Sequence, residues 1–66
     1  MRLPRIFTSQ VLSVGAEVLL SKEAVHYVQQ VLRLRSGATV VLFNGQGGEY
    51  RGVLRQNHKA LLVFIE

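Results

Sequence analysis

The absence of cysteine from a chain of only 66 residues constrains the possible folds more than any other feature. Folded chains of about 60 residues bury only about 60% of the surface that they expose when unfolded. Domains of this size often depend on disulfides or a structural metal, and without cysteine neither disulfides nor cysteine-based zinc sites can form. One hydrophobic core must therefore stabilise the whole chain, so we expect a single domain.

The chain is also basic. Eight Lys and Arg against four Glu give a formal net charge of +4. So much positive charge on a small domain favours a polyanionic partner, through phosphate contacts and the release of counterions. The sequence has no apolar run near the ~20 residues that cross a membrane, and its N-terminus lacks the apolar stretch of a signal peptide. We therefore expect a cytoplasmic domain with no membrane partner.

One amphipathic helix is predicted at about residues 22–33. Ser21 suits the N-cap, and Glu23 lies in the first turn, where the helix dipole favours an anion. The apolar residues at helical spacing cover an arc of about 120°, which can face a core. They are Ala24, Val25, Val28, Val31 and Leu32. Ser36 and Gly37 are typical of a helix stop.

The rest of the chain alternates β-type runs with turn signals, of which Asn44-Gly45 is the strongest. The predicted strands are Arg5–Phe7, Glu17–Leu20, Thr39–Phe43, Glu49–Arg55 and Ala60–Ile65. The last of these is apolar on both sides, which predicts that something outside this chain covers its outer side. The pattern predicts a compact, mostly antiparallel barrel of five or six strands with the one helix, because closure removes exposed sheet edges.

The sequence offers few groups for catalysis. His26 and His58 have no carboxylate at metal-ligand spacing, and the four glutamates (Glu17, Glu23, Glu49 and Glu66) are scattered. The glycines at 45–48 precede a strand, with no Lys-Ser or Lys-Thr after them, so they favour a hairpin turn over a phosphate-binding loop. We predict no catalytic, cofactor-binding or metal-binding residue, and we do not expect this piece alone to be an enzyme.

The basic and aromatic residues are the candidates for RNA binding. The planar guanidinium of Arg bonds two phosphate oxygens at once, and Tyr27, at the border of the helix's apolar side, can stack on an unpaired base. Phe7, Phe43 and Phe64 fit a core by their pattern. The predicted RNA-binding residues are Arg2, Arg5, His26, Tyr27, Arg33, Arg35, Arg51 and Arg55. From these residues alone, a merely solubilising charged surface is slightly favoured over an RNA-binding surface.

The chain resembles the ribosomal RNA small subunit methyltransferase E family over essentially its whole length. The resemblance rests on the order and spacing of Arg5-Ile6-Phe7, His26–Leu34 (HYVQQVLRL), the Ser36-Gly37 turn and Phe43–Tyr50 (FNGQGGEY). It implies a small antiparallel PUA-like β-barrel, and it makes residues 1–66 the N-terminal part of a longer chain. The family commonly has two adjacent histidines where this chain has His26-Tyr27.

The resemblance also implies a function. In this family a C-terminal knotted domain binds S-adenosylmethionine, forms a homodimer and methylates N3 of a uridine in 16S, small-subunit, ribosomal RNA, while the N-terminal barrel helps to bind that RNA. The cofactor and catalytic residues would belong to the C-terminal domain, so none is carried over. Arg5, Arg33 and Arg35 are then the main expected RNA contacts. Two alternatives remain: a non-catalytic scaffold or interaction module, and a stand-alone RNA-binding barrel.

Overall fold

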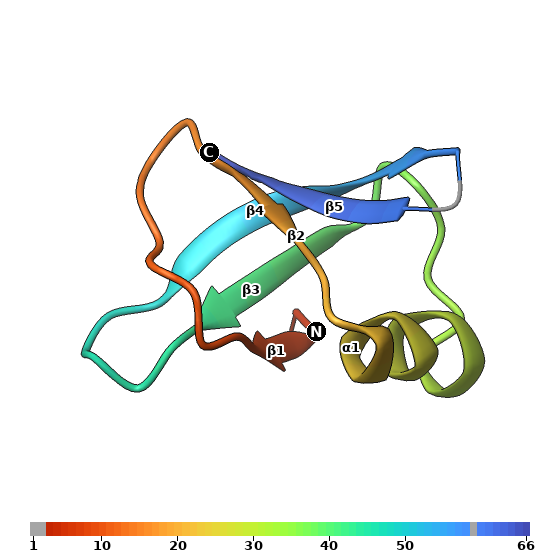
Figure 1. Cartoon of the computed structure of the whole chain (residues 1–66), viewed down its shortest axis with the longest axis horizontal. Coiled ribbons are helices and arrows are strands. Elements are labelled where there is room, and N and C mark those ends of the chain that lie inside the picture. Colours follow the sequence, from red (N-terminus) through yellow and green to blue (C-terminus); the bar gives the residue numbers. More distant parts are fainter. Residues whose placement is uncertain (1–2, 59) are drawn as a thin grey trace.

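Five strands form where β-branched and apolar residues lie between turn signals (Figure 1). The computed structural model describes residues 3–58 and 60–66. Its strands are β1 (Arg5–Phe7), β2 (Glu17–Leu19), β3 (Thr39–Phe43), β4 (Tyr50–Asn57) and β5 (Ala60–Ile65). Three have the predicted bounds. β4 begins one residue later than predicted and runs two residues further, because Gln56 and Asn57 pair with the start of β5.

The strands form one curled sheet in the order β1-β3-β4-β5-β2. β3, β4, β5 and β2 pair antiparallel, as predicted, whereas β1 pairs parallel with β3. The sheet is therefore mostly antiparallel, as predicted, and the β1–β3 pair at its edge makes it mixed. A parallel pair needs a long connection, and here the chain between β1 and β3 contains β2 and the helix (Figure 1).

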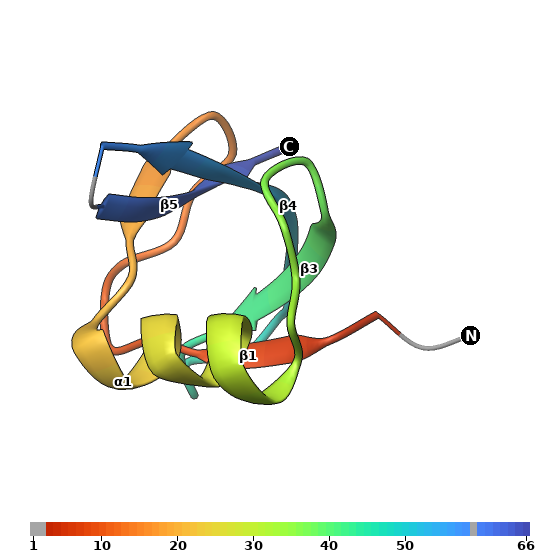
Figure 2. The same cartoon turned by 90° about the vertical axis from the view of Figure 1, so that its right-hand side faces the viewer.

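The concave side of the sheet holds the core, and the helical segment lies across its open side beside β1 (Figure 2). Side chains alternate in and out along each strand, so in β4 Gly52 and Leu54 are buried while Arg51 and Arg55 are exposed, as predicted. The buried apolar residues are Ile6, Leu12, Val18, Leu20, Val28, Val40, Leu42, Leu54, Leu61, Val63 and Ile65. Among the described residues, no helix has the length and apolar character needed to span a bilayer.

The helix begins as predicted but changes its winding. Ser21 caps α1 (Lys22–His26), where its Oγ accepts a hydrogen bond of 3.2 Å from the backbone N–H of Ala24. From Tyr27 to Val31 the chain continues as a π-helix, η1, with bonds from residue i+5 to residue i. Each turn then holds more than the roughly 3.6 residues of an α-helix. Val31 consequently faces solvent, 61% exposed, and the prediction that it packs in the core is wrong.

The helical segment also ends before residue 33, and not at the predicted stop. Arg33 adopts the left-handed conformation (φ 53°), and the N–H of Leu34 bonds the carbonyl of Val28 at 3.0 Å. A residue with positive φ beside such a bond is the usual way to terminate a helix, most often with glycine. Gly37 serves a later turn, in which the N–H of Ala38 bonds the carbonyl of Arg35 before β3 begins.

Candidate nucleic-acid interface

Arg5 is held in place by two neighbours. On β1 it forms an ion pair with Glu49, and its guanidinium carbon lies 5.3 Å from the ring centroid of Phe43. The strand register explains the contact with Phe43. Arg5 pairs with Val41 across the parallel β1–β3 pair, and Phe43, which pairs with Phe7, lies two residues further along β3 on the same side of the sheet. The side chain of Arg5 remains 54% exposed, so this ordered guanidinium can still reach a ligand.

Arg51 and Arg55 share the outer side of β4, as predicted. Arg55 covers an aromatic ring, because its guanidinium carbon lies 4.7 Å from the ring centroid of Phe64 on β5. Phe64 and Leu62 are therefore only partly exposed. Part of the cover on the outer side of β5 thus comes from Arg55 within the chain, and the expected cover from outside the chain stays a prediction.

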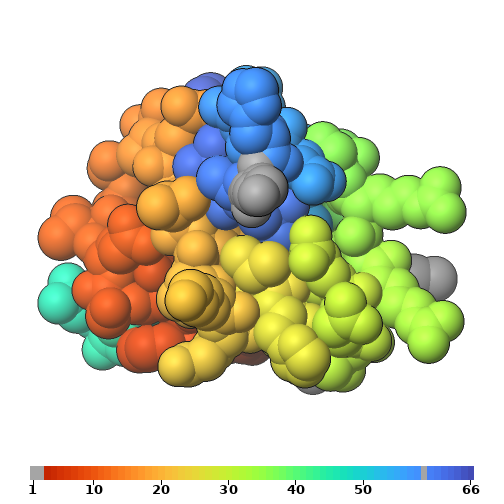
Figure 3. Space-filling model, turned by 45° about the vertical axis from the view of Figure 1, so that its right-hand side comes forward, coloured from red at the N-terminus to blue at the C-terminus, as the bar shows by residue number. Residues whose placement is uncertain are grey.

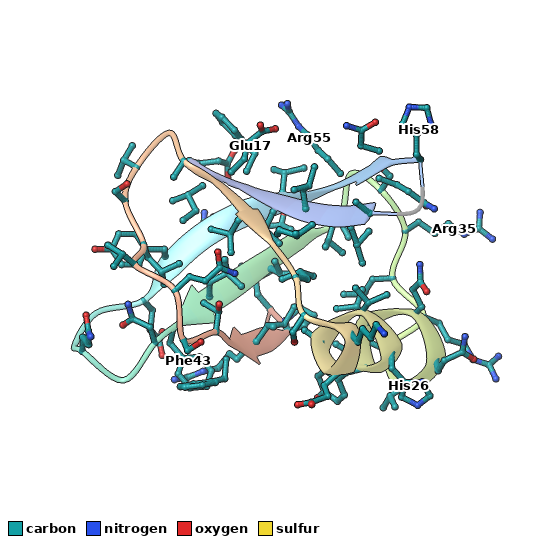
Figure 4. The ribbon with its side chains drawn as sticks, viewed as in Figure 1. Glu17, His26, Arg35, Phe43, Arg55 and His58 are labelled. Carbon is teal, nitrogen blue, oxygen red and sulfur yellow. The ribbon has the colours of Figure 1, made fainter. Side chains whose placement is uncertain are left out.

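Arg33 and Arg35 follow the helical segment and are both exposed, while Leu34 between them packs against the core. The left-handed conformation of Arg33 and the turn at Gly37 set this short segment apart from both the helix and β3. In Figure 4, Arg35 lies at the end of the barrel opposite the glycine-rich turn, away from Arg55 and His26. The predicted RNA-binding residues are thus spread over several faces.

His26 and Tyr27 are adjacent in sequence but open onto different depressions of the surface. His26 borders one of about 460 Å³ together with Lys22, Gln29 and Gln30. Tyr27 borders another of about 420 Å³, which β1 and the residues after it also line. Tyr27 and Arg5 are the two predicted residues that this second depression brings together. Arg2 lies outside the described residues.

Phe7 is the residue that sequence reasoning missed. It was predicted to be core but is 58% exposed, and it borders the same depression as Tyr27. In the three-residue strand β1 only Ile6 faces the core, so Arg5 and Phe7 both face outward. The alternation of Arg5, Ile6 and Phe7 along a strand was the signal that could have found it.

The glycine-rich segment 45–48 is a hairpin turn, as interpreted from the sequence. Gly45, Gly47 and Gly48 have positive φ angles, and the side-chain oxygen of Asn44 accepts a bond of 3.1 Å from the N–H of Gln46. Among the residues described, no three His, Cys, Asp or Glu side chains come together as a metal site would require. The turn connects β3 to β4.

S-adenosylmethionine is implied by the resemblance for the longer protein. None of three surface depressions on residues 3–58 and 60–66 has a lining with the net negative charge that would favour a sulfonium cation. Arg5 offsets Glu23 in one and Glu49 in another, and Lys22 makes the third basic. We therefore assign no cofactor site to this chain.

A curled five-stranded sheet with one short helix across its open side defines a PUA-like barrel. A family model described as the RNA methyltransferase PUA domain matches residues 20–66. The chain belongs to this family of RNA methyltransferase PUA domains. No curated protein sequence matches it significantly.

Two solved structures are similar to the chain over nearly its whole length. A Legionella pneumophila protein, assigned as a methyltransferase and solved with bound SAM, is 33% identical with a TM-score of 0.87 over 98% of this chain. The ribosomal RNA small subunit methyltransferase E of Neisseria gonorrhoeae, also bound to S-adenosylmethionine, is 29% identical with a TM-score of 0.80 over 97%. The chain spans 27% of the length of each of these relatives.

Proposed function

We propose that this chain is the RNA-docking domain of a longer, S-adenosylmethionine-dependent methyltransferase that modifies N3 of a uridine in 16S ribosomal RNA. The observation that carries the proposal is the match of residues 20–66 to PUA domains of RNA methyltransferases. The likeness to a ribosomal RNA small subunit methyltransferase supports the substrate class. The methyl-donor site, the reacting groups and the homodimer contacts would belong to a C-terminal knotted domain, and the protein would act in the cytoplasm.

Exposed arginines supply the chemistry for docking on RNA. Arg5, Arg33 and Arg35 would neutralise phosphates, and Arg2, Arg51 and Arg55 would extend the basic surface. His26 would add a polar contact and Tyr27 a stacking contact. Because His26, Arg35 and Arg55 lie on different faces of the small barrel (Figure 4), the predicted set fits a folded RNA that wraps around the domain better than a single straight strand. Each arginine that contacts phosphate would make binding more dependent on salt.

The experiment is a fluorescence anisotropy titration of the chain with a labelled small-subunit ribosomal RNA fragment at several salt concentrations. Each single variant, Arg5→Ala, Arg33→Ala and Arg35→Ala, removes one charge, and Lys22→Ala is the charge-matched control outside the predicted set. The triple arginine variant should weaken binding and flatten the plot of log K against log salt by about 2, at roughly 0.7 per phosphate contact on single strands. An unchanged slope in the triple variant would remove these residues from the interface.

Whether the chain belongs to a longer protein is tested by sequencing its gene. A reading frame that continues past the codon for Glu66 into a methyltransferase domain would support the proposal, and the encoded protein should then methylate the uridine. A stop codon would instead favour a stand-alone RNA-binding barrel.

A protein-interaction module is a second candidate, and one observation favours it. Val11, Val14 and Leu19 are large apolar residues on the surface, where they are available for contact with another protein domain. In this reading the barrel orients its partner domain and the charges only keep it soluble. The same anisotropy titration separates the two functions, because a scaffold would have no affinity for RNA at moderate salt.

A further inference from the structure

The depression between β1 and the start of α1 is unlike the rest of the surface because two exposed aromatic side chains border it. It has a volume of about 420 Å³, within the roughly 300–1,000 Å³ that small-molecule sites occupy. Phe7 lies on its strand side and Tyr27 on its helix side, 58% and 42% exposed. Figure 3 shows this face, where the first segment of the chain (red to orange) borders the start of α1 (gold).

The strand side of the depression is held by hydrogen bonds that do not involve its aromatic rings. The side chain of Gln10 donates a bond of 2.7 Å to the carbonyl of Leu19, and Asn44 donates one of 3.1 Å to the carbonyl of Gln10. The N–H of Thr8 bonds the carbonyl of Phe43 at 3.0 Å. Residues 8–10 are thus tied to β2 and to the end of β3, so the wall is preorganised for a ligand, which lowers the cost of binding.

The ring of Phe7 packs against a second aromatic ring, that of Phe43. The two rings meet edge-on, with the centroids 5.6 Å apart and the planes at 69°. This contact leaves more than half of the surface of Phe7 in water, where it gains nothing from the hydrophobic effect. A flat apolar ligand in the depression could cover Phe7 and Tyr27 together.

The charges around the depression select against a phosphate as its occupant. Glu23 lines it and would repel a phosphate, while its carboxylate can accept hydrogen bonds from N–H groups. Arg5 lines it as well, but its charge is already partly neutralised by Glu49. The combination of two aromatic side chains, one acceptor carboxylate and no net charge is complementary to a nucleobase, whose faces stack and whose edge carries N–H donors.

We propose that this depression binds one unpaired nucleobase of the RNA, which stacks on Phe7 and Tyr27 while Glu23 accepts hydrogen bonds from its edge. The proposal rests on the proposed RNA-docking function and adds the part of the RNA that the site recognises. Guanine fits best, because its N1–H and N2–H donors are adjacent and can both reach one carboxylate.

The first test uses uncharged nucleosides, so that attraction between the basic domain and phosphate plays no part. Guanosine is titrated into the isotope-labelled chain, and the NMR signals of the Phe7 and Tyr27 rings are followed, with ribose 5-phosphate as the second probe. Guanosine should shift both rings and ribose 5-phosphate neither. Glu23→Gln should weaken guanosine binding. Shifts with ribose 5-phosphate alone, or tighter binding of ribose 5-phosphate to Glu23→Gln, would mean that a phosphate occupies the depression and would overturn the proposal. Tighter binding of guanosine to Glu23→Gln would overturn the role of Glu23 as the acceptor of its hydrogen bonds.

The second test uses RNA. Phe7→Leu and Tyr27→Leu keep apolar side chains but remove the rings, and Val11→Ala and Val31→Ala are controls at exposed apolar residues outside the depression. With a short single-stranded RNA that carries one fluorescent guanine analogue with its N1–H and N2–H donors intact, the unmodified chain should quench the fluorescence by stacking. Each ring variant should reduce affinity about 5- to 150-fold, by the usual contribution of base stacking, and the controls should not.

The two proposals fail differently. If RNA binds the chain but Phe7→Leu and Tyr27→Leu match the unmodified protein in affinity and quenching, the base site is wrong and RNA docking stands. If the chain has no affinity for any RNA while guanosine still shifts both rings, the RNA-docking function is wrong and the depression is a nucleobase site used for another ligand. The folded state of each variant is checked by its NMR spectrum before titration.

Discussion

The guanidinium of Arg55 lies over the ring of Phe64, with its central carbon 4.7 Å from the ring centroid. Phe64 belongs to the outer side of β5, opposite the core residues Val63 and Ile65. A strand that is apolar on both sides would normally need a second layer, and here a long polar side chain from the neighbouring strand provides part of it. Arg side chains can cover apolar surface in this way while their charge stays in water.

Replacing Arg55 should therefore affect stability as well as charge. We expect Arg55→Ala to lower the free energy of unfolding by about 0.5–1 kcal/mol, the usual contribution of an exposed cation–π pair. Arg51→Ala is the matched control, because Arg51 lies on the same side of β4 and the structure records no ring beneath it among the described residues. Urea denaturation measures both variants. Equal losses would show that the Arg55–Phe64 contact contributes nothing of its own.

Because of the π-helical winding, we expect different losses of stability from substituting two valines that would both face the core in a regular α-helix. Val28 is completely buried, whereas Val31 is 61% exposed. Val28→Ala should lower the free energy of unfolding by about 2 kcal/mol, from lost burial and the cavity left behind. Val31→Ala should change it by less than about 0.5 kcal/mol, as expected at the surface. Thermal unfolding followed by circular dichroism distinguishes this result from equal, large losses, which would indicate a regular α-helix.

Local sequence features predicted most of the elements. The β-branched run of β3, the alternation in β4 and the Ser21 cap depend on neighbouring residues, so they could be found from the sequence. The parallel pairing of β1 could not, because it depends on how the chain returns after β2 and the helix. The π-helix was also missed, since bonds from i+5 to i leave no distinct pattern in a segment as short as Tyr27–Val31.

The candidate interface was less predictable than the fold. Arg5, Arg33, Arg35, Arg51 and Arg55 are exposed, as charged residues usually are, and their contact with RNA stays a prediction. The sequence could not show that Arg5 pairs with Glu49, since these residues are brought together only by the β1–β3–β4 arrangement. The depression shared by Phe7 and Tyr27 has the same origin, because its two sides come from segments that meet only in the folded barrel.

Gly52 should be the glycine least tolerant of substitution. A Cβ at this position would lie 2.8 Å from the carbonyl oxygen of Phe64 and would also collide with Val63. Overpacking of a core costs about 1–3 kcal/mol, and here the backbone of β5 would have to move as well. Gly52→Ala should therefore lower the free energy of unfolding by at least about 2 kcal/mol.

Gly47 provides the contrast, because it has open space around it but a positive φ of 87°. Gly47→Ala should cost about 1 kcal/mol from backbone conformation alone, and Gly47→Asn should recover part of that loss, since Asn tolerates positive φ. At Gly52, Asn should be no better than Ala. Chemical denaturation of the four variants tests this, and recovery by Asn at Gly52 would contradict the steric explanation.

Arg33 links the end of the helical segment to the proposed RNA contacts, so its substitutions should separate stability from binding. Its positive φ of 53° costs a residue with a Cβ about 1–2 kcal/mol, whereas glycine adopts it freely but loses about 0.5–1 kcal/mol more in backbone entropy on folding. Arg33→Gly should therefore leave the chain equally stable or more stable by up to about 1 kcal/mol, while Arg33→Ala keeps the strain and should change stability little.

Both Arg33 variants remove the same charge and should lose the same RNA affinity, with the salt dependence of binding reduced by about 0.7 in the slope. Thermal unfolding and anisotropy titrations on the same protein samples provide the two measurements. A loss of stability in Arg33→Gly would mean that the arginine side chain, and not the backbone, supports the helix end. Unequal RNA affinities of the two variants would mean that the backbone conformation at residue 33, as well as its charge, determines how the barrel meets RNA.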